Sequence, residues 1–349
     1  MTSSPVREAF SRQAEACETL GSPFTACLSK LFAERLGNGS AVADRILGWQ
    51  GDPSPSADSV PLRIAGCLHA LVLDGRAPAL AAAYPPHVVN DDQLWHAIEE
   101  ATREHAGFIL ERLNSPPQTN EVRRSGALLP GFFLLGEMFG MPLILSEAGA
   151  SAGLNLQWDR YAYDLGGRTV GAANSTVRIA PEWRGRTPPA SDVEVAARAG
   201  CDLNPIDAAD PSQRLRMLSY IWADQADRLD RTAHALDIAA RHDLSIERAD
   251  AIDWLAGRFA QRHAGAVHVV FHTIAWQYFP KTLQERGASL IAEAGAQATH
   301  GAPLARLALE ADGKADGASL TLQIWPTGEI REIGRGDFHG RWVDWYGWR

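Results

Sequence analysis

From residue 142 onward, apolar segments of strand length alternate with amphipathic segments of helix length. This alternation limits the fold more than any other feature of the sequence. Strands that alternate with helices form parallel sheets. Three later segments (LARLALEADG, ASLTLQIWPTG and EIREIGRG) follow one another with no room for helices between them. The sequence therefore predicts an α/β domain with a mostly parallel sheet that ends in antiparallel strands.

The first ~115 residues differ from the rest, because they read as a series of helices separated by capping and breaking residues, with no clear strand. We therefore expect two domains. Residues 1–125 would form an α-helical cap on the substrate side, and residues 126–349 a Rossmann-like domain. The alternating residues at about 161–190 predict a hairpin-like insertion in that second domain.

Composition excludes several classes of protein. The net charge of −9 argues against a nucleic-acid surface carried by the whole chain. No apolar run reaches the ~18 residues that a membrane span needs, and the N-terminus lacks the pattern of a signal peptide. We expect a cytoplasmic protein with a small-molecule substrate and no nucleic-acid or membrane partner. The sequence does not indicate the oligomeric state.

Cysteine and histidine spacing gives no indication of a metal site. The four cysteines have no C-x-x-C spacing, so we expect free thiols, buried in a reducing compartment. His268 and His272 lie four apart on a predicted strand, where they are roughly 13 Å apart, too far to share one ion.

The stretch LILSEAGASAGLNL, residues 143–156, matches two incompatible patterns. One is G-x-S-x-G, the nucleophile elbow of serine hydrolases, which would make Ser151 a nucleophile. Asp250 and His339 follow in the chain order that such a triad needs. In that fold, however, the elbow lies after several strands, and nothing upstream reads as a strand here. The hydrolase stays an alternative.

The second pattern is E-x-G-x-S-x-G after an apolar strand, and it resembles the first motif of class I S-adenosylmethionine-dependent methyltransferases. The resemblance implies that Gly149, Ser151 and Gly153 form a turn whose backbone amides face the cofactor. It also implies that Glu147 reaches the amino group of S-adenosylmethionine. Serine at the middle position departs from the usual glycine and makes the turn less permissive.

Three downstream stretches resemble later methyltransferase motifs and come in the same order. GCDLNPID implies that Asp202 accepts hydrogen bonds from the ribose hydroxyls. ERADAIDWL implies that Asp250 and Ala251 contact the adenine, although Asp250 also reads as a helix N-cap. VHVVFHTIAWQYF places His272 where the fourth strand should face the transferred methyl group, which makes it the candidate base.

Other polar residues complete the candidate site. Gln277 and Tyr278 follow His272 on the same loop and are assigned to the catalytic group. Asn120, Glu121 and Arg124 stand in an unusually polar junction, where they would bind a substrate or only cap helices. His339 in the aromatic tail is a further substrate-binding candidate. These substrate-side candidates come from SPPQTNEVRRSG and DFHGRWVDWYGW.

The whole chain also resembles a bacterial domain-of-unknown-function family, of the DUF 2332 type. The stretches that carry this resemblance include EAGASAGLNLQWDRY, CDLNPID and HTIAWQY. It supplies no reaction. The function expected from the sequence is therefore methyl transfer from S-adenosylmethionine to a small molecule. The alternatives are a serine hydrolase and a non-catalytic cofactor-binding module of the same fold.

Overall fold

The computed structural model describes residues 4–189, 191–242, 244–314 and 316–348. The chain divides into two compact units, Met1–Thr119 with Asp210–Asp230, and Asn120–Ala209 with Arg231–Arg349. This division differs from the expected boundary after residue 125, because a segment far along the chain groups with the first unit. Asp224 explains this grouping in part, since its carboxylate accepts hydrogen bonds from the Ser22 hydroxyl and the Phe24 amide.

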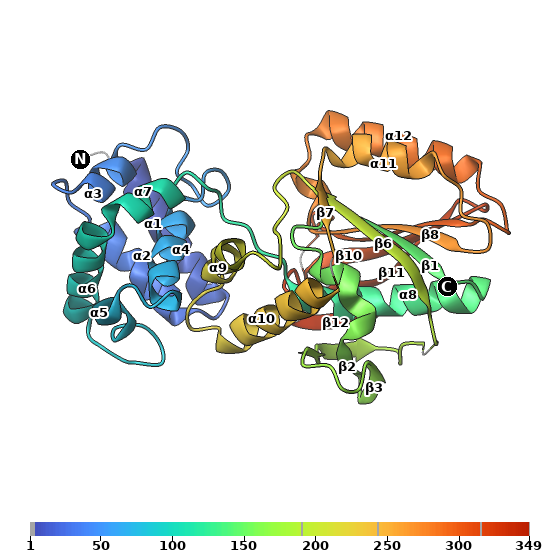
Figure 1. Cartoon of the computed structure of the whole chain (residues 1–349), viewed down its shortest axis with the longest axis horizontal. Helices are drawn as coiled ribbons and strands as arrows, with labels where there is room; N and C mark the ends of the chain where they lie inside the picture. Colours follow the sequence, from blue (N-terminus) through green and yellow to red (C-terminus); the bar gives the residue numbers. More distant parts are fainter. Residues whose placement is uncertain (1–3, 190, 243, 315, 349) are drawn as a thin grey trace. The chain divides into compact units, whose positions relative to one another are not determined.

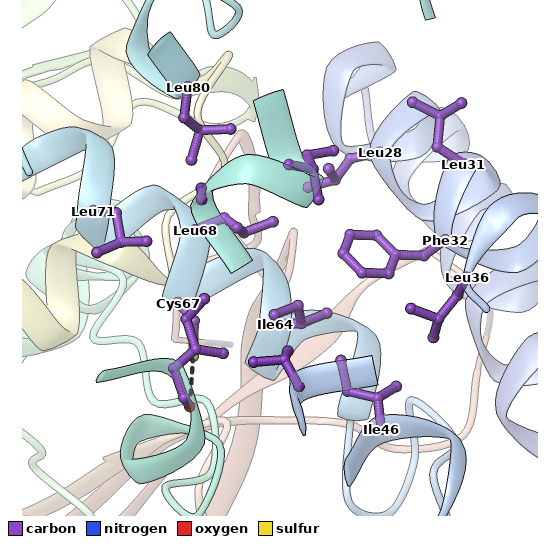
Figure 2. Packing of buried hydrophobic residues seen from close by; sticks show 14 of the residues in the cluster. Leu28, Leu31, Phe32, Leu36, Ile46, Ile64, Cys67, Leu68, Leu71 and Leu80 are labelled. Carbon is purple, nitrogen blue, oxygen red and sulfur yellow. Dashed lines mark hydrogen bonds between the residues drawn. The ribbon is translucent and has the colours of Figure 1, made fainter. Parts of the chain in front are cut away.

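The first unit contains no strand among its described residues, as the sequence predicted. Its helices are α1 (Pro5–Thr19), α2 (Pro23–Arg35), α3 (Ala41–Leu47), α4 (Val60–Leu73), α5 (Pro78–Ala81), α6 (Asp91–Glu104), α7 (Ala106–Arg112) and α9 (Pro211–Ser219), and α10 (Ala226–Arg241) begins in it. Figure 2 shows the core of this unit, where Phe32, Ile64 and Leu68 lie among other buried aliphatic side chains. At 2 % exposed or less, these residues contribute most by being removed from water.

The second unit is built on a nine-stranded sheet with the order β5-β12-β11-β10-β9-β8-β1-β6-β7. The strands are β1 (Leu143–Ala148), β5 (Glu182–Gly185), β6 (Val195–Asp202), β7 (Ile246–Arg248), β8 (Val267–Thr273), β9 (Leu304–Glu310), β10 (Ala318–Trp325), β11 (Glu329–Gly336) and β12 (Trp342–Trp345). From β7 to β9 all neighbours are parallel, whereas β9 to β12 pair antiparallel. The sheet therefore has the mostly parallel character, with antiparallel C-terminal strands, that the sequence predicted.

Helices cover both faces of this sheet (Figure 1). α11 (Ala251–Phe259) and α12 (Lys281–Ala296) pack on the face that includes Val270 of β8. α8 (Ser125–Phe139) packs on the other face, where Phe132 meets Phe271 edge-on at 5.4 Å. Val270 and Phe271 point to opposite sides because successive side chains of a strand alternate. All seven residues of β8 are buried, as expected for a strand covered on both sides.

The expected insertion is a separate three-stranded sheet of order β3-β2-β4. β2 (Ala162–Leu165) and β3 (Arg168–Gly171) form an antiparallel hairpin, and β4 (Arg178–Ile179) pairs parallel with β2. Three short 3₁₀ helices, η1 (Val122–Arg124), η2 (Leu154–Arg160) and η3 (Trp276–Tyr278), complete the second unit.

All four cysteines are free thiols, and those other than Cys27 are buried, which agrees with the sequence. No helix within the described residues is both long and apolar enough to cross a membrane.

Candidate functional site

Strands β1 and β8 form the topological switch point of the sheet. β6 and β7 extend from β1 on one side, and β9 follows β8 on the other. In open parallel sheets, ligands bind outside the carboxyl ends of the strands at such a point. Here those ends lead into the glycine turn after Ala148 and into the loop after Thr273. Most of the sequence-predicted site residues lie in or beside these two loops.

The glycine turn has a conformation that ordinary residues avoid. Gly149, Ser151 and Gly153 have φ values of 73°, 55° and 68°, in the left-handed region that glycine adopts at no steric cost. A Cβ atom on Gly149 would lie 2.7 Å from the Cβ of Ala275. The turn after β1 and the loop after β8 are therefore in direct contact, and Ser151 is a non-glycine residue held in strained backbone geometry.

Most backbone amides of the turn are bonded within the protein in this structure, whereas the sequence analysis expects them to face a ligand. The amides of Gly149 and Ala150 both donate to the carbonyl of Cys201, at 3.0 and 2.9 Å. The Ser151 amide donates to a carboxylate oxygen of Asp202 at 2.9 Å. The turn is thus bonded to the end of β6.

At the end of the turn, the amides of Gly153 and Leu154 are also bonded within the protein. Gly153 donates to the carbonyl of Ala150 at 2.7 Å. Leu154 donates to the side-chain oxygen of Asn120 at 2.9 Å. Asn120, which the sequence assigned to the substrate, therefore stabilises the start of η2 in this structure.

Three acidic residues lie at or just after the carboxyl ends of β1, β6 and β7, which are adjacent and parallel. Glu147 is the next-to-last residue of β1. Asp202 ends β6, and its carboxylate accepts from the amides of Ser151 and Asn204. Asp250 caps α11 by accepting from the amides of Ile252 and Asp253. The structure thus brings the predicted cofactor-binding carboxylates to one edge of the sheet.

Ala251, paired with Asp250 in the sequence analysis, is the first residue of α11 and is 9 % exposed. The N-cap role considered for Asp250 is present. It uses one oxygen of the carboxylate, Oδ1.

Glu147 is the most unusual of the three acids. Its side chain is 1 % exposed, and Oε2 is buried with no hydrogen-bond partner among the described residues. Burial raises the pKa of this carboxyl well above its ordinary value, and the charge of Asp202 raises it further, whereas Arg124 acts in the opposite direction. An isolated buried carboxylate is costly unless it is paired, and the opposing charge of Arg124 does not offset the burial of Glu147.

More buried polar atoms without partners lie in η2, directly after the turn. Both amide atoms of Asn155 and of Gln157 are buried and unbonded within the described chain, and so is Nε1 of Trp158. Asn155 and Gln157 are fully buried. Native structures contain few such groups. Their concentration in one short segment therefore sets η2 apart as a segment with unused hydrogen-bonding capacity.

Arg124 joins the junction segment to the loop after β8. Its Nε donates to the carbonyl of Phe338 at 2.8 Å, and its Nη1 donates to the carbonyl of Thr273 at 3.3 Å. Glu121 is 2 % exposed and accepts from the Arg123 amide. The junction therefore belongs to the site region, with Arg124 at the carboxyl end of β8.

The aromatic tail packs against the same junction. Gly340 has φ 69°, and a Cβ atom there would lie 2.6 Å from the carbonyl carbon of Arg123. The amide of the preceding residue, His339, donates to Asp337. Only glycine permits this close approach, so the tail turn and η1 form one packed element.

His272, the candidate base, has both ring nitrogens bonded. Nδ1 donates to Glu310 at 2.7 Å, while Nε2 accepts from Nε and Nη2 of Arg306, at 3.1 Å each. The ring stacks on Trp276 at 4.7 Å between centroids. Burial lowers the pKa of His272 even though Glu310 opposes this. A neutral ring that accepts from arginine cannot take a substrate proton until that arginine moves.

Glu310 holds the loop after β8 in place. Besides His272, its carboxylate accepts from the amides of Ala275 and Trp276, both at 3.1 Å, and from that of Gln277 at 3.4 Å. Burial would raise the pKa of Glu310, but the hydrogen bonds from His272 and these amides outweigh it and lower the pKa. Glu310 is therefore an ionised anchor for four donors.

The anchored loop contains a strained residue. Ile274 has φ 47°, an outlier for a β-branched side chain. Strain of this kind persists where the surroundings impose it, and it concentrates at functional sites.

Of the other loop candidates, Gln277 accepts from the Ala311 amide through its side chain, and Tyr278 is 74 % exposed. Tyr278 therefore lies at the surface rather than in the core.

Sequence reasoning missed Glu310, Arg306, Asn155 and Gln157. A signal for the first two was present, because charged residues in the otherwise apolar strand LARLALE must be paired when buried. Nothing in the sequence indicates that Asn155 and Gln157 are buried without partners, since amides are common on helix surfaces.

Ser151 has the backbone conformation of a nucleophile elbow, but a serine hydrolase also needs a histidine base beside the serine. A positive φ after a strand is what a nucleophile elbow needs. The histidines of β8 are bonded elsewhere, however: His268 Nε2 is 2.9 Å from the Ser146 hydroxyl, and His272 is held by Glu310 and Arg306. The hydrogen bonds of these two histidines therefore go to partners other than Ser151.

Comparison with known proteins gives one match. The model of a family described as "uncharacterized protein conserved in bacteria (DUF2332)" matches residues 7–345. A search of curated proteins and a search of solved structures each returned no match.

Proposed function

The chain belongs to this bacterial family, and we propose that its second unit binds S-adenosylmethionine and transfers the methyl group to a small molecule. The proposal depends on the carboxyl end of β1, where Glu147 is buried with an unbonded oxygen at the switch point. A ligand ammonium group would supply the donor and the positive charge that this carboxylate lacks. S-adenosylmethionine carries such a group.

The arrangement of the parallel strands supports the choice of ligand class. Counted along the chain, β7-β6-β1-β8-β9 has the order third, second, first, fourth, fifth. This is the order of doubly wound nucleotide-binding sheets. It places the ends of β1, β6 and β7 in a row, and the methyltransferase motifs assign one acidic residue to each of these ends.

Asp202 and Asp250 have capacity left for the nucleoside. Each oxygen of an ionised carboxylate accepts more than one hydrogen bond. Asp202 can therefore accept ribose hydroxyls while it keeps the amides of Ser151 and Asn204. Asp250 caps α11 through Oδ1 alone, which leaves Oδ2 for the adenine amino group.

When bound, the cofactor supplies a methyl group on a sulfonium, so the chain needs mainly to position the acceptor and exclude water. Glu310 serves positioning by fixing the loop after β8, and Arg124 fixes the carboxyl end of that strand. We assign His272 to the same task, because its Nε2 accepts from Arg306. His272 could remove a proton from the substrate only if Arg306 moved away from Nε2.

Calorimetry with S-adenosylmethionine and S-adenosylhomocysteine tests the proposal. We expect both to bind, and Glu147→Gln and Asp202→Asn each to weaken binding by about tenfold or more, the effect of one lost charge-assisted bond. Asp164→Asn is the matched control, because Asp164 caps a turn in the three-stranded sheet by accepting from the Gly167 amide. Absence of binding by both ligands would refute the cofactor assignment.

The same preparation separates the alternatives. Labelling of the chain by a fluorophosphonate, abolished by Ser151→Ala, would indicate a serine hydrolase. Binding of the cofactor with no methyl transfer to oxygen, nitrogen, sulfur or carbon acceptors would indicate a binding module.

A further inference from the structure

A cavity of about 410 Å³ lies in the second unit, on residues that the proposed methyl transfer does not use. It is bounded by the turn between β3 and β4, by the end of α10 and by the end of η2. Its lining residues are Arg160, Ala172, Ala173, Asn174, Ser175, Thr176, Ile238, Arg241 and His242. None of these is acidic, whereas three are cationic or can become so.

Arg160 is the residue that most needs a partner. Its Nη1 is buried and has no hydrogen-bond partner among the described residues. Burial lowers the pKa of Arg160, and the like charge of Arg198 lowers it further. The adjacent carboxylate, Asp159, is held by Arg198 in two hydrogen bonds at 2.7 and 2.9 Å. Arg160 is therefore a partly desolvated cation whose neighbouring anion is already engaged.

The end of α10 adds further donors to the cavity. Arg241 is the last residue of α10, where the helix dipole favours a cation. The position of Arg241 at the end of the helix explains why a basic residue stands there. It does not explain why its side chain has no hydrogen-bond or ion-pair partner. The side chains of Arg241 and His242 make no hydrogen bond or ion pair within the described chain. Thr176 and Asn174, from the turn between β3 and β4, also line the cavity.

We propose that this cavity binds a small molecule through a phosphate group held by Arg160 and Arg241. Guanidinium groups match phosphate because they donate two parallel hydrogen bonds to its oxygens. A dianion suits a site with two arginines better than a monovalent carboxylate does. The cavity volume falls within the range of small-molecule sites and exceeds what inorganic phosphate fills, so the ligand is a phosphate ester rather than the free ion.

This site is independent of the proposed cofactor site. Its arginines lie outside the switch-point loops. The observation behind it is the unpartnered Nη1 atom of Arg160, whereas the cofactor site rests on the carboxyl of Glu147. Either proposal can fail without the other.

Calorimetry on the full chain with ribose 5-phosphate, ribose and inorganic phosphate tests the inference. We expect ribose 5-phosphate to bind most tightly, its affinity to fall with added salt, and ribose not to bind. Arg160→Gln and Arg241→Gln should each weaken binding by tenfold or more. Arg178→Gln is the matched control, because Arg178 is an exposed arginine on β4 outside the cavity. It should bind like the parent.

Two further measurements make the outcome decisive. Arg160→Gln should melt at or above the parent temperature, because it removes a cation that has no partner. Glu147→Gln should leave ribose 5-phosphate binding unchanged, which separates this site from the cofactor site. Equal affinity for ribose and its phosphate, or binding unaffected by both arginine substitutions, would overturn the inference.

Discussion

The carboxylate of Glu310 accepts a hydrogen bond from Nδ1 of His272 at 2.7 Å, and this pair connects β9 to the loop after β8. The same carboxylate also accepts from three consecutive backbone amides of that loop. One side chain thus fixes the orientation of the histidine and the path of the strained segment that begins at Ile274.

Replacing Glu310 by Gln should lower the free energy of unfolding by about 3 kcal/mol, the scale of a broken buried ionic network. The amide offers one acceptor oxygen, and its NH₂ group would face backbone donors. Urea denaturation measures the change. Glu329→Gln is the control, because Glu329 pairs with Arg331 at the surface, where a pair contributes about 0–1 kcal/mol. Similar losses in both variants would contradict the anchoring role.

Glu147 should make stability depend on pH. Because its pKa is raised in the folded chain, its favourable contribution is complete below its ordinary pKa of 4.5 and is lost as pH rises through the folded pKa. Glu147→Gln removes this pH-dependent loss of stability, because glutamine does not ionise. The variant should therefore gain stability over the parent above pH 4.5, by about 1.4 kcal/mol for each pH unit until the folded pKa is reached.

Thermal melts of both proteins between pH 4 and pH 9 measure the difference. Glu137→Gln, at an exposed position on α8, should follow the parent at every pH. A constant offset between Glu147→Gln and the parent would show that Glu147 is ionised in the folded chain.

Gly340→Ala should destabilise the second unit by clash as well as by strain. The new Cβ atom would lie 2.6 Å from the Arg123 carbonyl carbon, in a backbone conformation with φ 69°. Gly328→Ala provides the matched control, since Gly328 has φ 73° but its nearest neighbour would be 3.8 Å away. We expect a loss of about 1 kcal/mol for strain alone and at least about 2 kcal/mol more for Gly340. Equal losses in denaturant melts would mean that the tail turn moves away from η1 without cost.

Asp224→Ala should destabilise the first unit. Asp224 accepts from the Ser22 hydroxyl and from the Phe24 amide in the first turn of α2, so its removal costs about 1–2 kcal/mol, as for the loss of a helix cap. Asp52→Ala, which removes a local turn contact to the Ser54 amide, should cost less. Circular dichroism during thermal unfolding measures both variants, and an unchanged midpoint for Asp224→Ala would refute the capping role.

Local patterns predicted the elements that have strong local signals. Apolar runs predict strands at 142–146 and 266–276, and periodicity predicts a helix at 280–298. These ranges lie within a few residues of the observed β1, β8 and α12. The periodicity of residues 211–243 predicts one helical stretch, whereas α9 and α10 are separate helices. Asp224, which lies between them, is bonded to a segment far away in sequence, and single-sequence periodicity does not contain such a partner.

The candidate site was predictable where residue type alone sets the position, as for the acids after β1, β6 and β7. Its hydrogen-bond partners were not predictable, because they depend on strand register. Glu310 reaches His272 only because β8 and β9 pair His272 with Ala308. The amides of the glycine turn were assigned to a ligand, yet the end of β6 lies close enough to accept them.

The parallel pairing of β5 with β12 has a consequence for how the chain folds. Glu182 pairs with Trp342, and β6 to β11 lie between them in the chain. β5 therefore leaves the ribosome before its partner is made, and its edge stays unpaired while residues 186–341 are synthesised. Such late, non-local pairing slows folding and exposes an open edge to other chains. Removing Trp342–Trp345 would leave that edge open permanently, so self-association rather than simple unfolding should be the main defect of a shortened chain.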